Sequence, residues 1–189
     1  MIQAILNSFF LVAVSEMGDK TQLLAFSLAA RFKRPWPVMG GILAATLLNH
    51  GLASYFGEWI SHAFRPDVLG YSVGAAFIAF GFWTLKPDSL DEKSHHPKLG
   101  AFVTTTILFF LAEMGDKTQL ATVALGAQYQ SAMLVTLGTT MGMLATDGLA
   151  VFLGEKLAEK VQMAYVRWIA AGLFFLCGLG AILKVFLHS

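Results

Sequence analysis

The sequence Glu-Met-Gly-Asp-Lys-Thr-Gln-Leu occurs twice in this chain, at residues 16–23 and again, without change, at residues 113–120. Both copies lie inside long apolar segments, and each brings two carboxylates and a lysine into its segment. Burying a charge in an apolar environment is costly, so ionisable residues inside a membrane segment indicate a functional site. The exact duplication further predicts that the site has two related halves.

The composition is that of a membrane protein. Of 189 residues, 56% are hydrophobic and 13% are charged, whereas soluble domains contain about 25% charged residues. A membrane-spanning helix needs about 20 mainly apolar residues. Six segments meet this requirement: residues 3–30, 36–57, 68–86, 99–127, 131–153 and 163–187. We therefore expect an all-α polytopic membrane protein with six transmembrane helices. The net charge of +1 gives no indication of nucleic-acid binding.

The repeat extends beyond the motif at a constant offset of 97 residues, which aligns position 16 with position 113. It predicts a first three-helix repeat at residues 1–86, a cytoplasmic linker at 87–98 and a second three-helix repeat at 99–189. Because three is an odd number of spans, the second half enters the membrane from the opposite side. The two repeats are then inverted, as in many transporters whose sites lie at the repeat interface near the midplane.

Basic residues in the expected loops favour one orientation in the membrane. Cytoplasmic loops carry an excess of lysine and arginine. One side has nine of them and the other has two: Arg31, Lys33, Arg34, Lys86, Lys93, Lys98, Lys156, Lys160 and Arg167 against Arg65 and Lys184. We therefore expect both termini to lie outside.

The paired motif predicts a site for a hard divalent cation. Acids three residues apart share one face of a helix, and facing repeats bring four carboxylates together: Glu16, Asp19, Glu113 and Asp116. Gly18 and Gly115 would let the backbone approach closely or the helix loosen locally. Neutral oxygen donors nearby are secondary candidates: Thr21, Gln22, Thr118, Gln119 and Asn49. Oxygen ligands of this kind suit Mg²⁺, Ca²⁺ or Mn²⁺.

The charges of the two motifs point to exchange between an ion and protons. Two acids and one lysine give each motif a formal charge of −1, so the pair carries −2. One divalent cation or two protons neutralise that charge, and competition between them is what an antiporter requires. An alternative is that the acids form static ion pairs with Lys20 and Lys117, although buried pairs rarely stabilise a fold.

Asp147 has no acidic counterpart in the first half of the repeat. Asp147 is a further acid within a span, and its counterpart at the 97-residue offset is His50, next to Asn49. Asp147 is a candidate proton-relay group or additional ligand, with an ion pair near the helix end as the alternative. His50 is a candidate for titration at physiological pH or for simple packing.

Two Glu-x-Gly-Asp-Lys-Thr motifs, one in the first span of each half, resemble the family of small cation/proton antiporters that contains bacterial manganese exporters of the MneA type and Golgi manganese and calcium transporters. The resemblance covers essentially the whole chain. It implies export of Mn²⁺, and possibly of Ca²⁺, driven by inward proton movement. It also implies metal binding by Glu16, Asp19, Glu113 and Asp116. The short N-terminus and central loop favour a bacterial inner-membrane protein.

Other functions remain open at the level of sequence. An exporter of an organic cation would use the same acidic cavity, and a passive divalent cation channel would show flux without proton coupling. An intramembrane protease is disfavoured because lysines beside the acids tend to keep them ionised. We therefore expect a transporter and not an enzyme, with the metal ion as substrate and no cofactor. Its partners are the ion, protons and the lipid bilayer.

Overall fold

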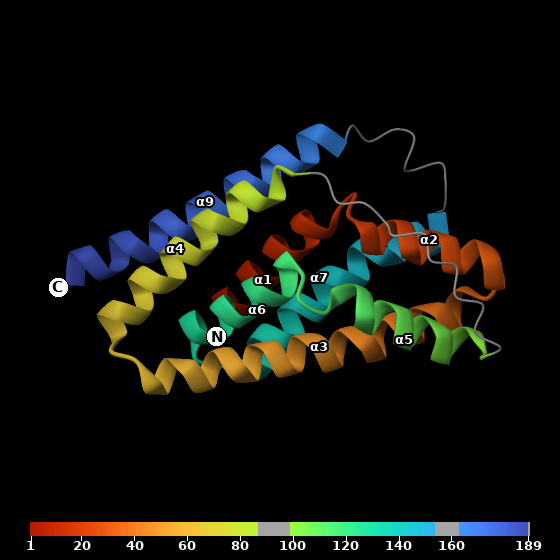
Figure 1. The fold of residues 1–189 in the computed structure, drawn as a ribbon, viewed down its shortest axis with the longest axis horizontal. Coiled ribbons are helices and arrows are strands. Elements are labelled where there is room, and N and C mark those ends of the chain that lie inside the picture. Colours follow the sequence, from red (N-terminus) through yellow and green to blue (C-terminus); the bar gives the residue numbers. More distant parts are fainter. Residues whose placement is uncertain (87–98, 154–162, 189) are drawn as a thin grey trace.

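The computed structural model describes residues 1–86, 99–153 and 163–188, and the regular structure of these residues is entirely helical (Figure 1). It comprises eight helices: α1 (Ile2–Glu16), α2 (Lys20–Phe32), α3 (Pro35–Ala63), α4 (Pro66–Thr84), α5 (Ala101–Glu113), α6 (Lys117–Tyr129), α7 (Ala132–Leu153) and α9 (Met163–His188). The expected linker at 87–98, and the connection that carries Lys156 and Lys160, lie outside the described residues.

Among the described residues, three helical segments are long and apolar enough to cross a membrane: Pro66–Thr84, Ala132–Leu153 and Arg167–Leu187. The helices α1 and α5 are apolar but shorter. These two helices are short because the expected spans at 3–30 and 99–127 are not single helices. Each is divided in two at the motif, into α1 and α2 and into α5 and α6, so the prediction of a continuous helix through the motif is wrong.

Both breaks have the same backbone geometry. After α1, Met17 is extended and Gly18 has a φ of 79°. After α5, Met114 is extended and Gly115 has a φ of 77°. A left-handed residue just after a helix is the usual place for glycine, because a side chain is strained there. The following aspartate is the N-cap of the next helix in each case.

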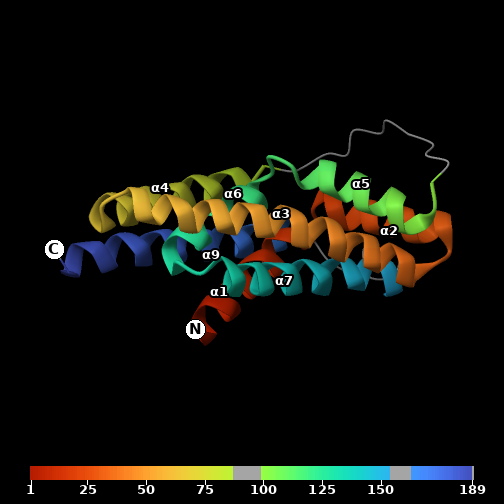
Figure 2. The same cartoon turned by 90° about the horizontal axis from the view of Figure 1, so that it is seen from below.

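The two halves run in opposite directions and interlock. In Figure 1, α1, α2 and α4 run from left to right, whereas α5, α6 and α9 run from right to left. The long helix of each half packs on the broken helix of the other, α3 on α5 and α6, and α7 on α1 and α2. Figure 2 shows α3 with α5 and α6 on one side and α7 on the other. The helices α4 and α9 form a further pair.

Glycines allow the long and broken helices to touch through their backbones. A Cβ on Gly57 of α3 would lie 2.0 Å from the Val123 carbonyl oxygen of α6, and one on Gly126 would lie 2.4 Å from that of Ser54. A Cβ on Gly142 of α7 would lie 2.6 Å from the Phe9 oxygen of α1. Small residues at such contacts are typical of membrane helix packing, where close approach replaces the hydrophobic driving force.

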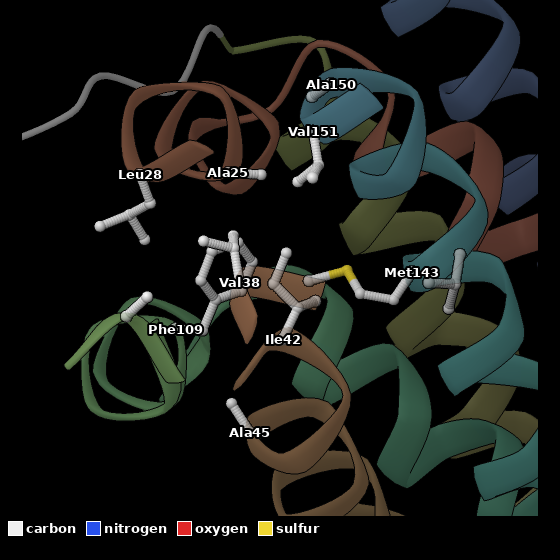
Figure 3. Packing of buried hydrophobic residues seen from close by; sticks show 11 residues of the cluster. Ala25, Leu28, Val38, Ile42, Ala45, Phe109, Met143, Ala150 and Val151 are labelled. Carbon is white, nitrogen blue, oxygen red and sulfur yellow. The ribbon is translucent and has the colours of Figure 1, made fainter. Parts of the chain in front are cut away.

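Two apolar clusters lie within this frame. One joins α2, α3, α5 and α7 through residues that include Leu28, Ile42, Phe109 and Met143 (Figure 3). The other lies where α4, α6 and α9 meet, around Phe77 and Phe174, with the half-buried Cys177 packed against it. The broken helices are thus held on both sides, which fixes the position of the two breaks.

Candidate metal site at the helix breaks

The helix breaks determine where the four motif acids lie. Glu16 and Glu113 are the last residues of α1 and α5, while Asp19 and Asp116 are the N-caps of α2 and α6. All four are buried, with 0% to 5% of their surface exposed. The expectation that each Glu–Asp pair shares one helix face is therefore wrong. The two acids of a motif belong to different helices and meet at the gap between them.

The breaks bring acids of both halves together. Carboxylate oxygens of Glu16, Asp19 and Asp116 all lie within 4.8 Å of one another. Oxygens on opposite sides of a calcium-sized ion, bound at about 2.3–2.6 Å, are about 5 Å apart. Three buried carboxylates at this spacing match the size and the ligand preference of one hard divalent cation.

Each motif lysine forms an ion pair with the aspartate of the other motif. Lys117 Nζ lies 2.8 Å from Asp19 Oδ2, and Lys20 Nζ lies 3.4 Å from Asp116 Oδ1. The sequence suggested pairs within one motif, whereas these two ion pairs join different motifs. The crossed pairs connect the two halves directly at the site and supply positive charge beside the carboxylates when no cation is bound.

The two glutamates have different surroundings. Glu16 accepts hydrogen bonds from Thr21 Oγ1 at 2.7 Å and from Thr118 Oγ1, a residue of the other half. Neither carboxylate oxygen of Glu113 has a hydrogen-bond partner among the described residues. His50 Nε2 lies 4.0 Å from Glu113 Oε2, and Glu113 also interacts electrostatically with Glu16 and Asp116. Glu113 is therefore near the cluster but outside its hydrogen-bond network.

Asp147 and His50 are fully buried on the two long helices. Neither oxygen of Asp147 and neither ring nitrogen of His50 has a hydrogen-bond partner in the described part of the chain. Asp147 interacts electrostatically with Glu16 and Asp19. The ion pair considered for Asp147 is not seen among the described residues, and its roles as proton relay or additional ligand stay predictions.

The amide side chains beside the motif make several hydrogen bonds. Gln22 and Gln119 accept from the backbone N–H groups of Gly18 and Gly115. Asn49 Nδ2 donates to the Phe110 carbonyl oxygen at 3.1 Å. Direct contact of these residues with a metal ion stays a prediction.

A polar contact between α3 and α7, outside the motifs, was missed by sequence reasoning. Glu58, which reads in sequence as a solvated charge at a loop edge, accepts a hydrogen bond from the Ala132 backbone N–H at 2.6 Å. Ala132 is the first residue of α7, where N–H groups lack partners within the helix. The only signal was the position of Glu58 near a helix end.

A small cavity of about 30 Å³ adjoins the first break. Its lining includes Gly18, Asp19 and Lys117, together with Lys86 and Arg167 near one end of α4 and of α9. A space of this size holds about one water molecule. Part of the cluster and these basic residues thus line one common space.

The sequence of this chain matches a known protein family. The family profile described as "Divalent cation/proton antiporter GDT1" matches residues 4–92 and, separately, residues 101–188. The chain belongs to the GDT1 family. GDT1 proteins are transporters and not a family of enzymes, and the substrates in the family's description are a divalent cation and protons. Each of the two matched regions contains one copy of the repeated motif.

Curated relatives agree with this assignment to the GDT1 family. A "Putative manganese exporter" of Vibrio cholerae serotype O1 is 43% identical over 169 residues, covering 89% of this chain and 84% of that protein. A GDT1-like protein of Synechocystis is 31% identical over 202 residues, covering 93% and 95%. GDT1-like protein 3 of Arabidopsis thaliana is 28% identical over 211 residues, covering 93% and 69%. No solved structure matches the chain.

Proposed function

We propose that this GDT1 protein exports Mn²⁺ from the cytoplasm in exchange for protons, at one site built from both motifs. The observation that carries the proposal is the convergence of Glu16, Asp19 and Asp116 within 4.8 Å in a buried position. Glu113 completes the site from its place beside the cluster, when an ion draws the carboxylates together. The 43% identity with a "Putative manganese exporter" supports Mn²⁺ as the ion.

The size of the cluster favours a bare ion over an organic cation. The three carboxylates are as close as ligands of one metal ion are, and the adjoining cavity holds about one water molecule. A larger cation would require the two halves to separate at the crossed ion pairs. Ca²⁺ shares the preference for oxygen ligands and is the main competitor.

Proton coupling follows from the charges at the site. Adjacent carboxylates in a medium of low dielectric constant repel one another strongly, and either a divalent cation or protons relieve the repulsion. Release of the ion therefore favours proton uptake, and binding of the ion favours proton release. An ion and protons that exclude each other from one site, alternately exposed to the two sides, give antiport.

The arrangement of the helices supports six spans in two inverted three-helix repeats. The broken helices α1–α2 and α5–α6 each make one span, and counterparts in the two halves run in opposite directions (Figure 1). Non-helical backbone at membrane depth is tolerated where it lines a site. We place the protein in the bacterial inner membrane with both termini outside, so that the small cavity beside Lys86 and Arg167 faces the cytoplasm.

Proteoliposomes test this function directly. Purified protein is reconstituted with a pH-sensitive dye inside, and Mn²⁺, Ca²⁺ or Mg²⁺ is added outside. We expect Mn²⁺ to drive proton movement and Ca²⁺ to compete with it. Glu16→Gln and Glu113→Gln should each abolish the signal, because either change removes one charge from the site. Asp67→Asn is the control, since this acid is exposed and paired with Arg65.

Two results would contradict the proposal. Unchanged exchange in both glutamate variants would place the transport path elsewhere. Mn²⁺ flux that persists without any proton movement would indicate a passive channel.

A further inference from the structure

The first observation concerns the backbone N–H of Gly18, which follows the end of α1. Gln22 lies in the first turn of α2, and its Oε1 accepts a hydrogen bond from this N–H at 2.8 Å. An N–H without an acceptor is costly at membrane depth. The contact resembles a capping box, in which a side chain at the third helical position bonds back to the backbone before the helix.

The second half repeats this contact. Gln119 Oε1 accepts from the Gly115 N–H at 2.7 Å. Both glycines are left-handed, with φ values of 79° and 77°. Each break is therefore closed by a glutamine in the same way.

The other end of each side-chain amide reaches the opposite half. Gln22 Nε2 donates to the Thr146 carbonyl oxygen of α7 at 3.1 Å, and Gln119 Nε2 donates to Asn49 Oδ1 of α3 at 3.4 Å. Residues 49 and 146 occupy the same position in the repeat. Each glutamine thus connects the break of one half to the equivalent point on the long helix of the other.

We propose that Gln22 and Gln119 are positioning residues that set the geometry of the two breaks and couple each break to the opposite half. The inference rests on the proposed function. It assigns these amides a role that requires no metal ligation, because each Oε1 accepts a glycine N–H and each Nε2 donates to the opposite half. Glu16 and Asp19 flank Gly18, so a change in the Gly18 backbone displaces both acids of the first motif. When α7 moves relative to α1 and α2, the amide makes the break follow.

Two variants of Gln22 separate its two contacts. Gln22→Met keeps the length of the side chain and removes both hydrogen bonds. Gln22→Glu keeps an acceptor for Gly18 but puts an oxygen against the Thr146 carbonyl. The control is Gln3→Met, which makes the same replacement at an exposed position of α1.

Hydrogen–deuterium exchange of the peptide that contains Gly18 measures, in metal-free protein, whether Gln22 protects the Gly18 N–H. We expect faster exchange in Gln22→Met, and exchange as in wild type for both Gln22→Glu and the control. A ligand role without positioning predicts no change in metal-free protein. Unchanged exchange in Gln22→Met therefore overturns the proposal.

Mn²⁺ affinity and transport rate measure how the Gln22 variants affect the metal site. Loss of one or two hydrogen bonds corresponds to about a tenfold weaker binding of Mn²⁺ in Gln22→Met. Gln22→Glu should slow transport at saturating Mn²⁺ while Gly18 stays protected. Gln22→Met could instead bind Mn²⁺ as tightly as the wild type while the Gly18 N–H exchanges faster. That result would show a purely structural role for the glutamine and overturn the proposal.

Two features keep the test decisive. If Gln22→Met does not fold, Gln22→Glu alone tests the proposal, which expects slower transport with Gly18 still protected from exchange. Loss of both Gly18 protection and transport would contradict the proposal, and so would loss of neither. The exchange measurement needs no metal and no pH gradient. A wild-type protein that fails to exchange Mn²⁺ for protons would therefore refute the proposed function and leave this reading of the amides to be decided by the deuterium data.

Discussion

Glu16 and Glu113 occupy the same position in identical octets, yet the fold treats them differently. Glu16 receives hydroxyl hydrogen bonds from Thr21 and Thr118, one from each half. Glu113 has no hydrogen-bond partner among the described residues and lies 4.0 Å from His50. Identical sequence therefore gives unequal sites. Under the proposed alternating access one repeat moves against the other, so we expect this conformation to show each glutamate in one of the two environments that it occupies in turn.

The lysines show a similar inequality, and the largest expected effect concerns them. Lys117 and Asp19 have side chains 5% and 1% exposed and are 2.8 Å apart, whereas Lys20 is 22% exposed and 3.4 Å from Asp116. Removing one partner of a buried ion pair costs about 3–5 kcal/mol, while a partly exposed pair contributes about 1 kcal/mol or less. Lys117→Met should therefore lower the free energy of unfolding far more than Lys20→Met.

Titration with SDS in mixed micelles measures both variants without metal. Added Mn²⁺ should restore part of the stability lost in Lys117→Met, because the ion supplies the missing positive charge. Equal losses in the two variants would contradict the unequal burial of the two pairs.

Replacing each glutamate by glutamine should have unequal effects on stability. Glu16→Gln leaves one acceptor oxygen for two threonine hydroxyls and places an N–H₂ group against them, which costs about 1–3 kcal/mol. Glu113→Gln replaces a buried carboxyl group that has no hydrogen bond in the described structure, and should leave the metal-free protein equally stable or more stable. Melting temperatures of the metal-free variants measure this difference. Similar destabilisation by both changes would show that the two glutamates have equivalent surroundings.

The smallest effect is the coupling between Thr118 and Glu16 across the halves. Thr118→Val removes the hydroxyl and should cost about 1 kcal/mol in the wild-type background. In a Glu16→Gln background the cost should shrink, and in a Glu113→Gln background it should stay the same. Double-mutant cycles on the free energy of unfolding measure these terms. A cycle that couples Thr118 to Glu113 instead would reverse the comparison.

Much of this arrangement was readable in the sequence. The composition predicted a helical membrane protein, and the repeat predicted two related halves with acids from both. The doubled motif also identified the family. Each of these inferences depends only on which residues the chain contains and at what spacing.

Local loosening at Gly18 was among the expectations, but a full break into two helices was missed because the apolar pattern continues through the motif and favours one helix. Local signals were present. A glycine is followed by an aspartate at the N-cap position and, three residues later, by Gln22, and this is a helix stop and restart. The crossed lysine pairs were beyond reach, since spacing along the chain cannot show which aspartate of two identical motifs lies nearer. The contact between Glu58 and Ala132 was also beyond reach, because spacing along the chain does not show which helices pack together.

Counting bound Mn²⁺ tests most directly the claim that the two motifs build one site. Equilibrium dialysis of the purified protein against radioactive Mn²⁺ gives the number of ions per chain. We expect one ion per chain in the wild type and a large loss of binding in both Asp19→Asn and Asp116→Asn, because the two aspartates come from different halves and lie within 4.8 Å of a common glutamate. Two ions per chain in the wild type, with one retained in each variant, would show two independent sites and contradict the account.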